Sequence, residues 1–201
     1  MTANAITLFR LFLTFIVIAI FKQHTYIDIA CIVTILIIFI LDSVDGIVAR
    51  KHNQTSTFGA VFDIAADRIV ENVFWIYFAS ITDFIPLWMP IVVVTRGILT
   101  DGIRGIALTD GKTPFEMMTI PWTRALTSSR VSRALSGLSK ILSFTFLPAV
   151  PVFEKMQLNA DFLKVFSTTT LIIATIAVAI NLIRGVPVLV DGWKYIKNSS
   201  Q

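Results

Sequence analysis

Long apolar stretches follow one another along the chain and are separated by short polar segments. A helix of roughly 20 mostly apolar residues is long enough to cross the hydrocarbon core of a bilayer. The predicted transmembrane helices cover residues 4–21, 27–50, 58–82, 85–108, 137–152 and 162–195. They take up nearly the whole length and leave no room for a separate soluble domain. The pattern therefore predicts an all-α, polytopic membrane protein with six transmembrane helices and one domain over residues 1–201.

The polar segments between these stretches predict how the helices are connected. Residues 110–136 form the longest polar segment and are expected at the membrane surface, partly as an interfacial helix around residues 115–122. Residues 83–86 predict a turn. Pro187 falls late in the last apolar stretch, and a proline inside a helix kinks or breaks it. We therefore expect the last helix to be kinked or ended near this residue.

The composition agrees with a membrane protein. Of the 201 residues, 55% are hydrophobic and 15% are charged, which is unusual for a soluble domain. The formal net charge is +4, but the basic residues do not gather with aromatic residues as in a nucleic-acid interface. Cys31 is the only cysteine, which excludes an intramolecular disulfide. The first apolar stretch lacks a basic start and a clear cleavage site, so we expect a retained helix rather than a signal peptide.

The distribution of lysine and arginine predicts the orientation in the membrane, because cytoplasmic loops carry an excess of both. With the link between the second and third helices in the cytoplasm, the basic residues on that side are Arg50, Lys51, Arg104, Lys112, Arg124, Arg130, Arg133, Lys194 and Lys197. The basic residues on the other side are then Lys22, Lys155 and Lys164. Both termini are therefore expected in the cytoplasm.

Four acidic residues interrupt the second and third apolar stretches. Asp42 and Asp45 stand three positions apart and Asp63 and Asp67 four apart, so each pair shares one face of its helix. An acid at the centre of a bilayer costs about 2.5 to 3.5 kcal/mol on insertion scales, so four of them require a compensating cation. The short link at residues 51–57 makes the two helices antiparallel, which brings the pairs together. Carboxylate oxygens suit magnesium or manganese better than zinc.

A structural role for the four acids is the alternative. They would then pair with basic side chains inside a helix bundle, and the basic residues near them in sequence are Arg50, Lys51 and Arg68. The residues around the acids favour a ligand site instead. Small residues, which let helix backbones approach closely or admit a ligand, lie between the acids, and Arg50 offers a planar fork that suits phosphate.

The segment from Asp42 to Asp67 resembles the signature of the CDP-alcohol phosphatidyltransferases, D-x2-D-G-x2-A-R-x8-G-x3-D-x3-D, and it matches every fixed position. This resemblance implies a CDP-diacylglycerol donor, release of CMP, two magnesium or manganese ions, and a homodimer. The family's metal ligands correspond to Asp42, Asp45 and Asp63, and Asp67 corresponds to the general base, with a metal ligand or both roles as the alternatives for Asp67. The residues beside the donor correspond to Gly46, Ala49, Arg50 and Gly59. The implied place is the cytoplasmic membrane of a bacterial-type cell, with the active site facing the cytoplasm.

Other polar residues point to the acceptor. Within the family the chain most resembles the phosphatidylglycerol-phosphate synthases, many of which open with the N-x2-T-x2-R pattern formed here by Asn4, Thr7 and Arg10. The alternative for Asn4 is a helix cap. The alternative for Arg10 is a lipid-facing residue whose charged end extends to the water at the membrane surface. The positions that resemble the acceptor-phosphate site of glycerol-phosphate-type and inositol-phosphate-type members are Arg96, Arg104 and Lys140. For Arg104, pairing with Asp101 is the alternative.

The resemblance favours sn-glycerol 3-phosphate as the acceptor, because three converging cations suit a phosphorylated alcohol. The chain departs from those synthases at Gly97, where an acid is usual, and at Leu138 and Ile141, where a lysine and a threonine are usual. Inositol phosphate or another alcohol therefore remains an alternative acceptor. A divalent-cation transporter is a more remote alternative, since acids inside a membrane often mark ion routes.

Overall fold

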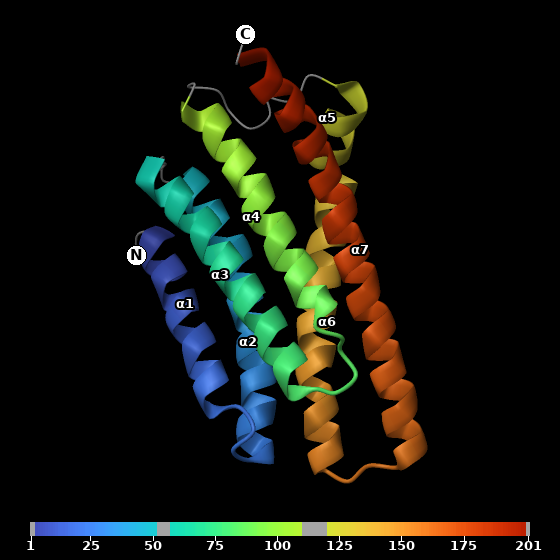
Figure 1. Ribbon diagram of the computed structural model, residues 1–201. Coiled ribbons are helices and arrows are strands. Elements are labelled where there is room, and N and C mark those ends of the chain that lie inside the picture. Colours follow the sequence, from blue (N-terminus) through green and yellow to red (C-terminus); the bar gives the residue numbers. More distant parts are fainter. Residues whose placement is uncertain (1–2, 52–56, 110–119, 200–201) are drawn as a thin grey trace. The chain divides into compact units, whose positions relative to one another are not determined.

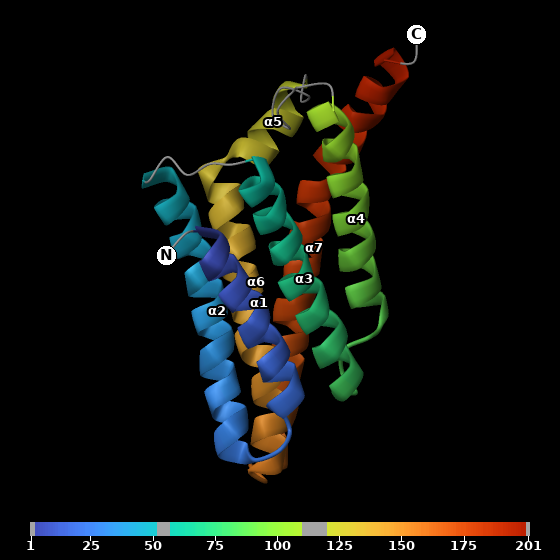
Figure 2. The same ribbon diagram turned by 90° about the vertical axis from the view of Figure 1, so that its left-hand side faces the viewer.

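The computed structural model describes residues 3–51, 57–109 and 120–199. Within these ranges it is all-helical and holds no strand, which confirms the predicted all-α class. The helices are α1 (Ala3–Ile20), α2 (Thr25–Lys51), α3 (Thr57–Ile81), α4 (Trp88–Thr109), α5 (Pro121–Ser128), α6 (Arg130–Lys155) and α7 (Ala160–Ser199). Figures 1 and 2 show α1, α2 and α3 side by side, with successive helices running in opposite directions.

Membrane character is supported, but six crossings are not established. Among the described residues, three helical segments are long and apolar enough to span a bilayer: Thr25–Asp42, Arg130–Lys155 and Ala160–Trp193. The apolar helix Asn4–Ile20 is shorter. Helices α3 and α4 lie where the sequence predicts them. They are not among the segments that are apolar enough to span a bilayer, because charged residues interrupt their apolar runs.

The helix predicted from residue 137 begins earlier than expected. Helix α6 begins at Arg130, so residues 130–136 are helical although they belong to the long polar segment. The prediction was wrong because it followed the apolar run alone. Ser136 and Ser139 are buried in α6 while Leu135 and Leu138 are more than half exposed. The interfacial helix expected around residues 115–122 lies mostly outside the described residues, and α5 begins at Pro121.

Pro187 does not end the last helix. Helix α7 continues through this residue to Ser199, so of the two predicted outcomes, a kink or an end, the helix does not end there. Helix α6 also contains prolines, Pro148 and Pro151. A proline inside a membrane helix is tolerated where neighbouring groups satisfy the backbone that it leaves without a hydrogen bond.

Helix α1 buries polar residues on its inner face as far as Thr14, and its outer face is apolar. The side chains of Thr7 and Thr14 are at most 2% exposed, whereas Leu8 and Phe12 are each 61% exposed. The hydroxyl of Thr14 donates to the backbone oxygen of Arg10, so its hydrogen bond stays within the helix. An outer surface of large apolar side chains fits lipid and not water.

The chain forms two compact units. Unit 1 contains Met1–Leu87 and Ile141–Ile172, and unit 2 contains Trp88–Lys140 and Ile173–Gln201. Helices α6 and α7 are each divided between the two units.

An aromatic cluster forms the core of unit 1. The ring of Phe144 in α6 stacks on Phe39 of α2 at a centroid distance of 5.3 Å. It also contacts Phe74 and Trp75 of α3 at 5.7 and 5.4 Å. Phe74 and Phe144 are fully buried. These contacts join three helices at one point and fix α2 beside α3, the two helices that carry the acidic residues.

An ion pair between a buried carboxylate and an exposed lysine closes one end of unit 1. The carboxylate of Asp28, in α2, accepts from the ammonium group of Lys155 at 2.9 Å and from the backbone N–H of Lys22 at 2.7 Å. Lys155 also donates to the backbone oxygen of Lys22 at 3.1 Å. Lys22 has a positive φ of 73°, in the turn after α1. This network places Lys22 and Lys155 at the same end of the unit, as the charge distribution predicts.

Two glycines let α4 and α7 pack closely in unit 2. A Cβ at Gly185 would meet the side chain of Arg96, and a Cβ at Gly192 would meet that of Ile103. From the first contact to the second, the position moves seven residues towards the C-terminus in both α4 and α7. The two helices are therefore parallel along this contact. The hydroxyl of Thr123 in α5 donates to the carboxylate of Asp191 in α7, which is 1% exposed.

Candidate active site

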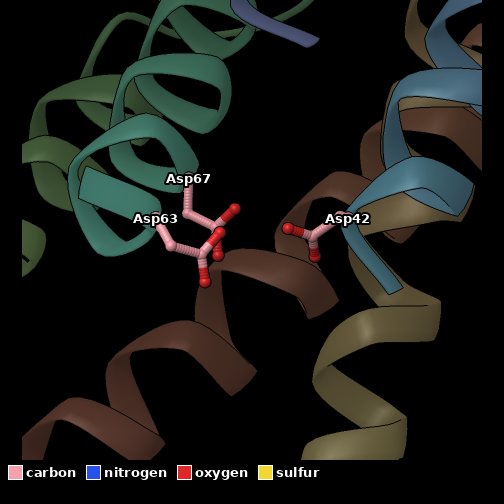
Figure 3. Close-up of side chains that lie close together, drawn as sticks. All are labelled: Asp42, Asp63 and Asp67. Carbon is pink, nitrogen blue, oxygen red and sulfur yellow. The ribbon is translucent and has the colours of Figure 1, made fainter. Parts of the chain in front are cut away.

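Three of the four signature aspartates converge in unit 1. Asp42 projects from α2, and Asp63 and Asp67 project from α3 towards it (Figure 3). One carboxylate oxygen from each lies within 4.8 Å of the others. The four-residue spacing on α3 and the antiparallel directions of α2 and α3, which both pack against α1, produce this arrangement.

The fourth aspartate and most of the donor residues are not described in full. Asp45, Gly46, Ala49 and Arg50 belong to α2, but their side chains lie outside the described residues. Gly59 is half-buried in α3 and stands one turn before Asp63. The acid cluster of the following paragraphs is therefore defined as Asp42, Asp63 and Asp67.

A buried arginine contacts the acid cluster. The side chain of Arg10 in α1 is 2% exposed, and its Nη2 lies 2.6 Å from the Oδ1 of Asp42 and 2.8 Å from the Oδ1 of Asp67. Its Nη1 lies 3.9 Å from the Oδ1 of Asp63. Such charge-assisted hydrogen bonds are among the strong ones in proteins. The cation that the acids require therefore comes in part from α1.

This contact differs from what the sequence suggested. The neighbouring basic residues considered there were Arg50, Lys51 and Arg68, and the described partner of Arg68 is Glu71, at 3.5 Å. Arg10 does not reach out to water either, since it is buried against the acids. Asn4 lies inside α1, which begins at Ala3, and not at a cap position.

The acid cluster fits a hard divalent cation. It offers carboxylate oxygens alone, which magnesium and manganese prefer. The side chains of Asp42, Asp63 and Asp67 are 36%, 45% and 44% exposed, so the cluster is accessible although Arg10 is buried. Among the described side chains of this cluster, three carboxylates lie against one guanidinium.

Three of the six predicted acceptor residues lie in unit 2, and the other three, Asn4, Thr7 and Arg10, lie in unit 1. Arg96 and Arg104 belong to α4, and Lys140 lies in the part of α6 assigned to this unit; all three are half-buried. Arg104 Nη1 lies 3.5 Å from Asp101 Oδ1, so the pairing considered for this residue is present. The side chain of Arg96 lies against Gly185 of α7.

Arg184 was not predicted as a site residue. This residue lies in α7, and its Nε is buried with no hydrogen-bond partner among the described residues. It lies within electrostatic range of Arg104 and Arg133. It also lines a groove of about 630 Å³ whose other walls come from α5, α6 and α7, with Trp122, Leu126, Leu135, Ile180 and Ile183 among them. The position of a single arginine within a long apolar stretch is the sequence feature that could have singled out Arg184.

The described residues form an all-helical protein of membrane character with a cluster of carboxylates that could hold a metal ion. Comparison with known families makes this specific: the sequence model of the CDP-alcohol phosphatidyltransferase family matches residues 1–195. The chain therefore belongs to the CDP-alcohol phosphatidyltransferase family.

Individual relatives match over short stretches. The chain is 61% identical over 31 residues to the CDP-diacylglycerol–inositol 3-phosphatidyltransferase 1 of Arabidopsis thaliana, which is 15% of this chain and 14% of that protein. It is 36% identical over 63 residues to the CDP-diacylglycerol–glycerol-3-phosphate 3-phosphatidyltransferase of Bacillus subtilis (strain 168), which is 31% of this chain and 32% of that protein. The matches thus span about a third or less of these relatives. No solved structure matches the chain at a significant level.

Proposed function

We propose that the protein transfers a phosphatidyl group from CDP-diacylglycerol to sn-glycerol 3-phosphate, giving phosphatidylglycerol phosphate and CMP. The observation that carries this proposal is the convergence of Asp42, Asp63 and Asp67, from two helices, within the family's signature. Carboxylates gathered inside a membrane helix pair are costly, and a site for charged phosphates and cations accounts for them.

The reaction is a single displacement at phosphorus. The acceptor hydroxyl oxygen forms a bond to the phosphorus of the phosphatidyl group, the bond from that phosphorus to the CMP oxygen breaks, and CMP leaves with the electron pair. Asp67 accepts the hydroxyl proton. A positioned carboxylate can do this because it orients the hydroxyl before transfer.

Asp42, Asp45, Asp63 and Asp67 would hold two magnesium or manganese ions, and Asp67 has both roles. When bound, these ions neutralise the charge of the diphosphate and stabilise the leaving group. Gly46, Ala49, Arg50 and Gly59 bind the donor beside the acids. The small residues let the nucleotide approach the backbone, and Arg50 pairs with the diphosphate.

The acceptor's phosphate binds to Arg96, Arg104 and Lys140. Asn4, Thr7 and Arg10 stay predictions from the sequence for the acceptor, and the described contacts of Arg10 are with the acid cluster. Two observations support phosphate binding by the three cations. Each of the three unit 2 cations is half-buried, where a charge-assisted contact to phosphate is worth more than at an open surface. The Bacillus subtilis relative carries glycerol 3-phosphate in its name.

Inositol, free or phosphorylated, is the second candidate acceptor. The observation that favours it is the local match to two Arabidopsis thaliana proteins named as inositol 3-phosphatidyltransferases, each 61% identical over 31 residues. In this reading the donor chemistry is unchanged and only the acceptor site differs.

The proposed setting is a bacterial-type cytoplasmic membrane. We infer one membrane domain over residues 1–201 with six crossings, both termini and the active site in the cytoplasm, and a homodimer as in the family. The single family model over residues 1–195 supports one domain. The large apolar side chains exposed on α1 and on the other helices support burial in lipid.

The test is a transfer assay with purified protein, CDP-diacylglycerol and either magnesium or manganese. Glycerol 3-phosphate, inositol, inositol phosphate, glycerol and serine are supplied one at a time, and both CMP and the lipid product are measured. We expect metal-dependent CMP release with glycerol 3-phosphate as the best acceptor. Release with inositol or its phosphate alone would support the second candidate. A protein that conducts divalent ions across vesicles without releasing CMP would contradict both.

A further inference from the structure

Arg10 occupies an unusual position for a basic residue in a membrane helix. Its side chain is 2% exposed, whereas the three carboxylates around it are 36–45% exposed. The guanidinium therefore lies on the protein side of the acid cluster. Because Arg10 stands in α1, it joins the first helix to the two helices that carry the acids.

The contacts of Arg10 use the same groups that a divalent ion would use. Its Nη2 is 2.6 Å from the Oδ1 of Asp42 and 2.8 Å from the Oδ1 of Asp67, and both carboxylates belong to the set whose oxygens lie within 4.8 Å of one another. A guanidinium and a divalent ion next to the same carboxylates repel each other. Binding of one must therefore weaken binding of the other, and this coupling is reciprocal.

We propose that Arg10 is the resident counter-ion of the acid cluster, which holds Asp42 and Asp67 together in the metal-free protein and lowers the affinity of the cluster for divalent cations. It is a positioning residue in this role, and the inference rests on the metal site of the proposed function. The guanidinium cannot lose its charge in a protein, so the competition is present at every physiological pH.

This arrangement has a consequence for the order of binding. A cluster partly neutralised by Arg10 attracts a divalent ion less strongly than three bare carboxylates would. The negative charge of a diphosphate donor adds to the attraction when the donor is present. Arg10 therefore couples tight metal binding to the presence of an anionic substrate, and it limits capture of cations by the empty site.

The first experiment measures manganese binding to the protein in phosphatidylcholine nanodiscs, which carry no anionic lipid. Free Mn²⁺ is followed by electron paramagnetic resonance for the parent and for Arg10→Gln, Arg10→Lys and Arg68→Gln. Arg10→Gln removes the charge, and Arg10→Lys keeps it. Arg68→Gln is the matched control because it removes one arginine charge next to Asp67 in sequence, from a residue whose described partner is Glu71.

We expect Arg10→Gln to bind Mn²⁺ about tenfold more tightly than the parent, within the range of roughly 5- to 150-fold that is typical of coupled sites. Arg10→Lys and Arg68→Gln should stay close to the parent. A folded Arg10→Gln with the parent's affinity would overturn the proposal. An equal gain in Arg68→Gln would also overturn it, because the effect would then be one of net charge.

The second experiment keeps the proposal testable if Arg10→Gln is unstable. The melting temperature is measured with EDTA and with Mg²⁺. We expect Arg10→Gln to be destabilised in EDTA and to gain more from Mg²⁺ than the parent does, because the ion replaces the missing charge. If Arg10→Gln aggregates with Mg²⁺ as readily as without it, the guanidinium has a packing role that a cation cannot fill, and the proposal is wrong.

Failure of this inference and failure of the proposed function give different results. If the parent transfers no phosphatidyl group to any acceptor but the manganese affinities differ as expected, the function is wrong and the counter-ion role stands. If transfer is observed and the affinities do not differ, the function stands and Arg10 has another role.

Discussion

Gly185 of α7 lies directly against the side chain of Arg96 in α4. A Cβ added at Gly185 would be 2.8 Å from the Cγ of Arg96, a distance at which one of the two must move. Contact at the middle of the side chain leaves Arg96 few ways to adjust. The glycine thus determines where the arginine side chain can lie within unit 2.

The Gly185→Ala variant should therefore weaken acceptor binding although Gly185 itself is not proposed to bind a substrate. If Arg96 binds the acceptor's phosphate, its displacement should raise the KM for glycerol 3-phosphate by about threefold to tenfold, a part of the roughly 1.5 to 3 kcal/mol of a charge-assisted contact. Steady-state kinetics with each substrate varied in turn is the measurement. The matched control is Gly102→Ala in α4, where a Cβ would have nothing within 4 Å. A KM that rises equally in both variants would show that helix stiffness, and not Arg96, is responsible.

Loss of a carboxylate from the acid cluster should nearly abolish transfer. Asp63→Asn removes one charge and one ligand oxygen but keeps the shape of the side chain, so the protein should remain folded. EDTA should stop the parent enzyme in the same way, and added magnesium or manganese should restore it. CMP release is measured, with the melting temperature as the check on folding. Activity close to that of the parent, in the variant or in EDTA, would refute a metal role for the cluster.

The acid cluster could be predicted from the sequence because it depends on local rules. A spacing of four residues places Asp63 and Asp67 on one helix face, and a short link turns α3 back along α2, so Asp42 meets them. The contact with Arg10 could not be predicted in this way. Arg10 is 57 positions from Asp67, and periodicity does not say which helix α1 faces.

The fold was predictable to a similar degree. Apolar runs located most of the helices because lipid exposure requires an apolar surface along each one. The start of α6 was missed since Arg130 and Arg133 make its first turns polar, although these turns are helical. Continuation of α7 through Pro187 depends on packing, which a single sequence does not reveal.

The ion pair between Asp28 and Lys155 should stabilise unit 1 without affecting catalysis. Lys155→Met leaves a carboxylate that is 2% exposed without its cation, and we expect a loss of about 1 to 3 kcal/mol, since Lys155 itself is 36% exposed. The melting temperature should fall, while the KM values for donor and acceptor stay unchanged. The double variant Asp28→Asn with Lys155→Met should recover part of the loss. Lys164→Met, at an exposed position of α7, is the control and should leave the melting temperature unchanged. A stable Lys155→Met would mean that water or lipid headgroups replace the ammonium group.

The acceptor is tested most directly at Arg96. Arg96→Ala should raise the KM for sn-glycerol 3-phosphate by about tenfold or more, because a charge-assisted contact contributes roughly 1.5 to 3 kcal/mol. The KM for CDP-diacylglycerol should move much less, which separates an acceptor defect from misfolding. Arg130→Ala, at an exposed position at the start of α6, is the control for loss of a positive charge in unit 2. Unphosphorylated glycerol should be a poor acceptor, since it leaves the cations of the site without their anion. If free inositol is the true acceptor, Arg96→Ala should leave its KM unchanged, because that alcohol carries no phosphate for the arginine to bind.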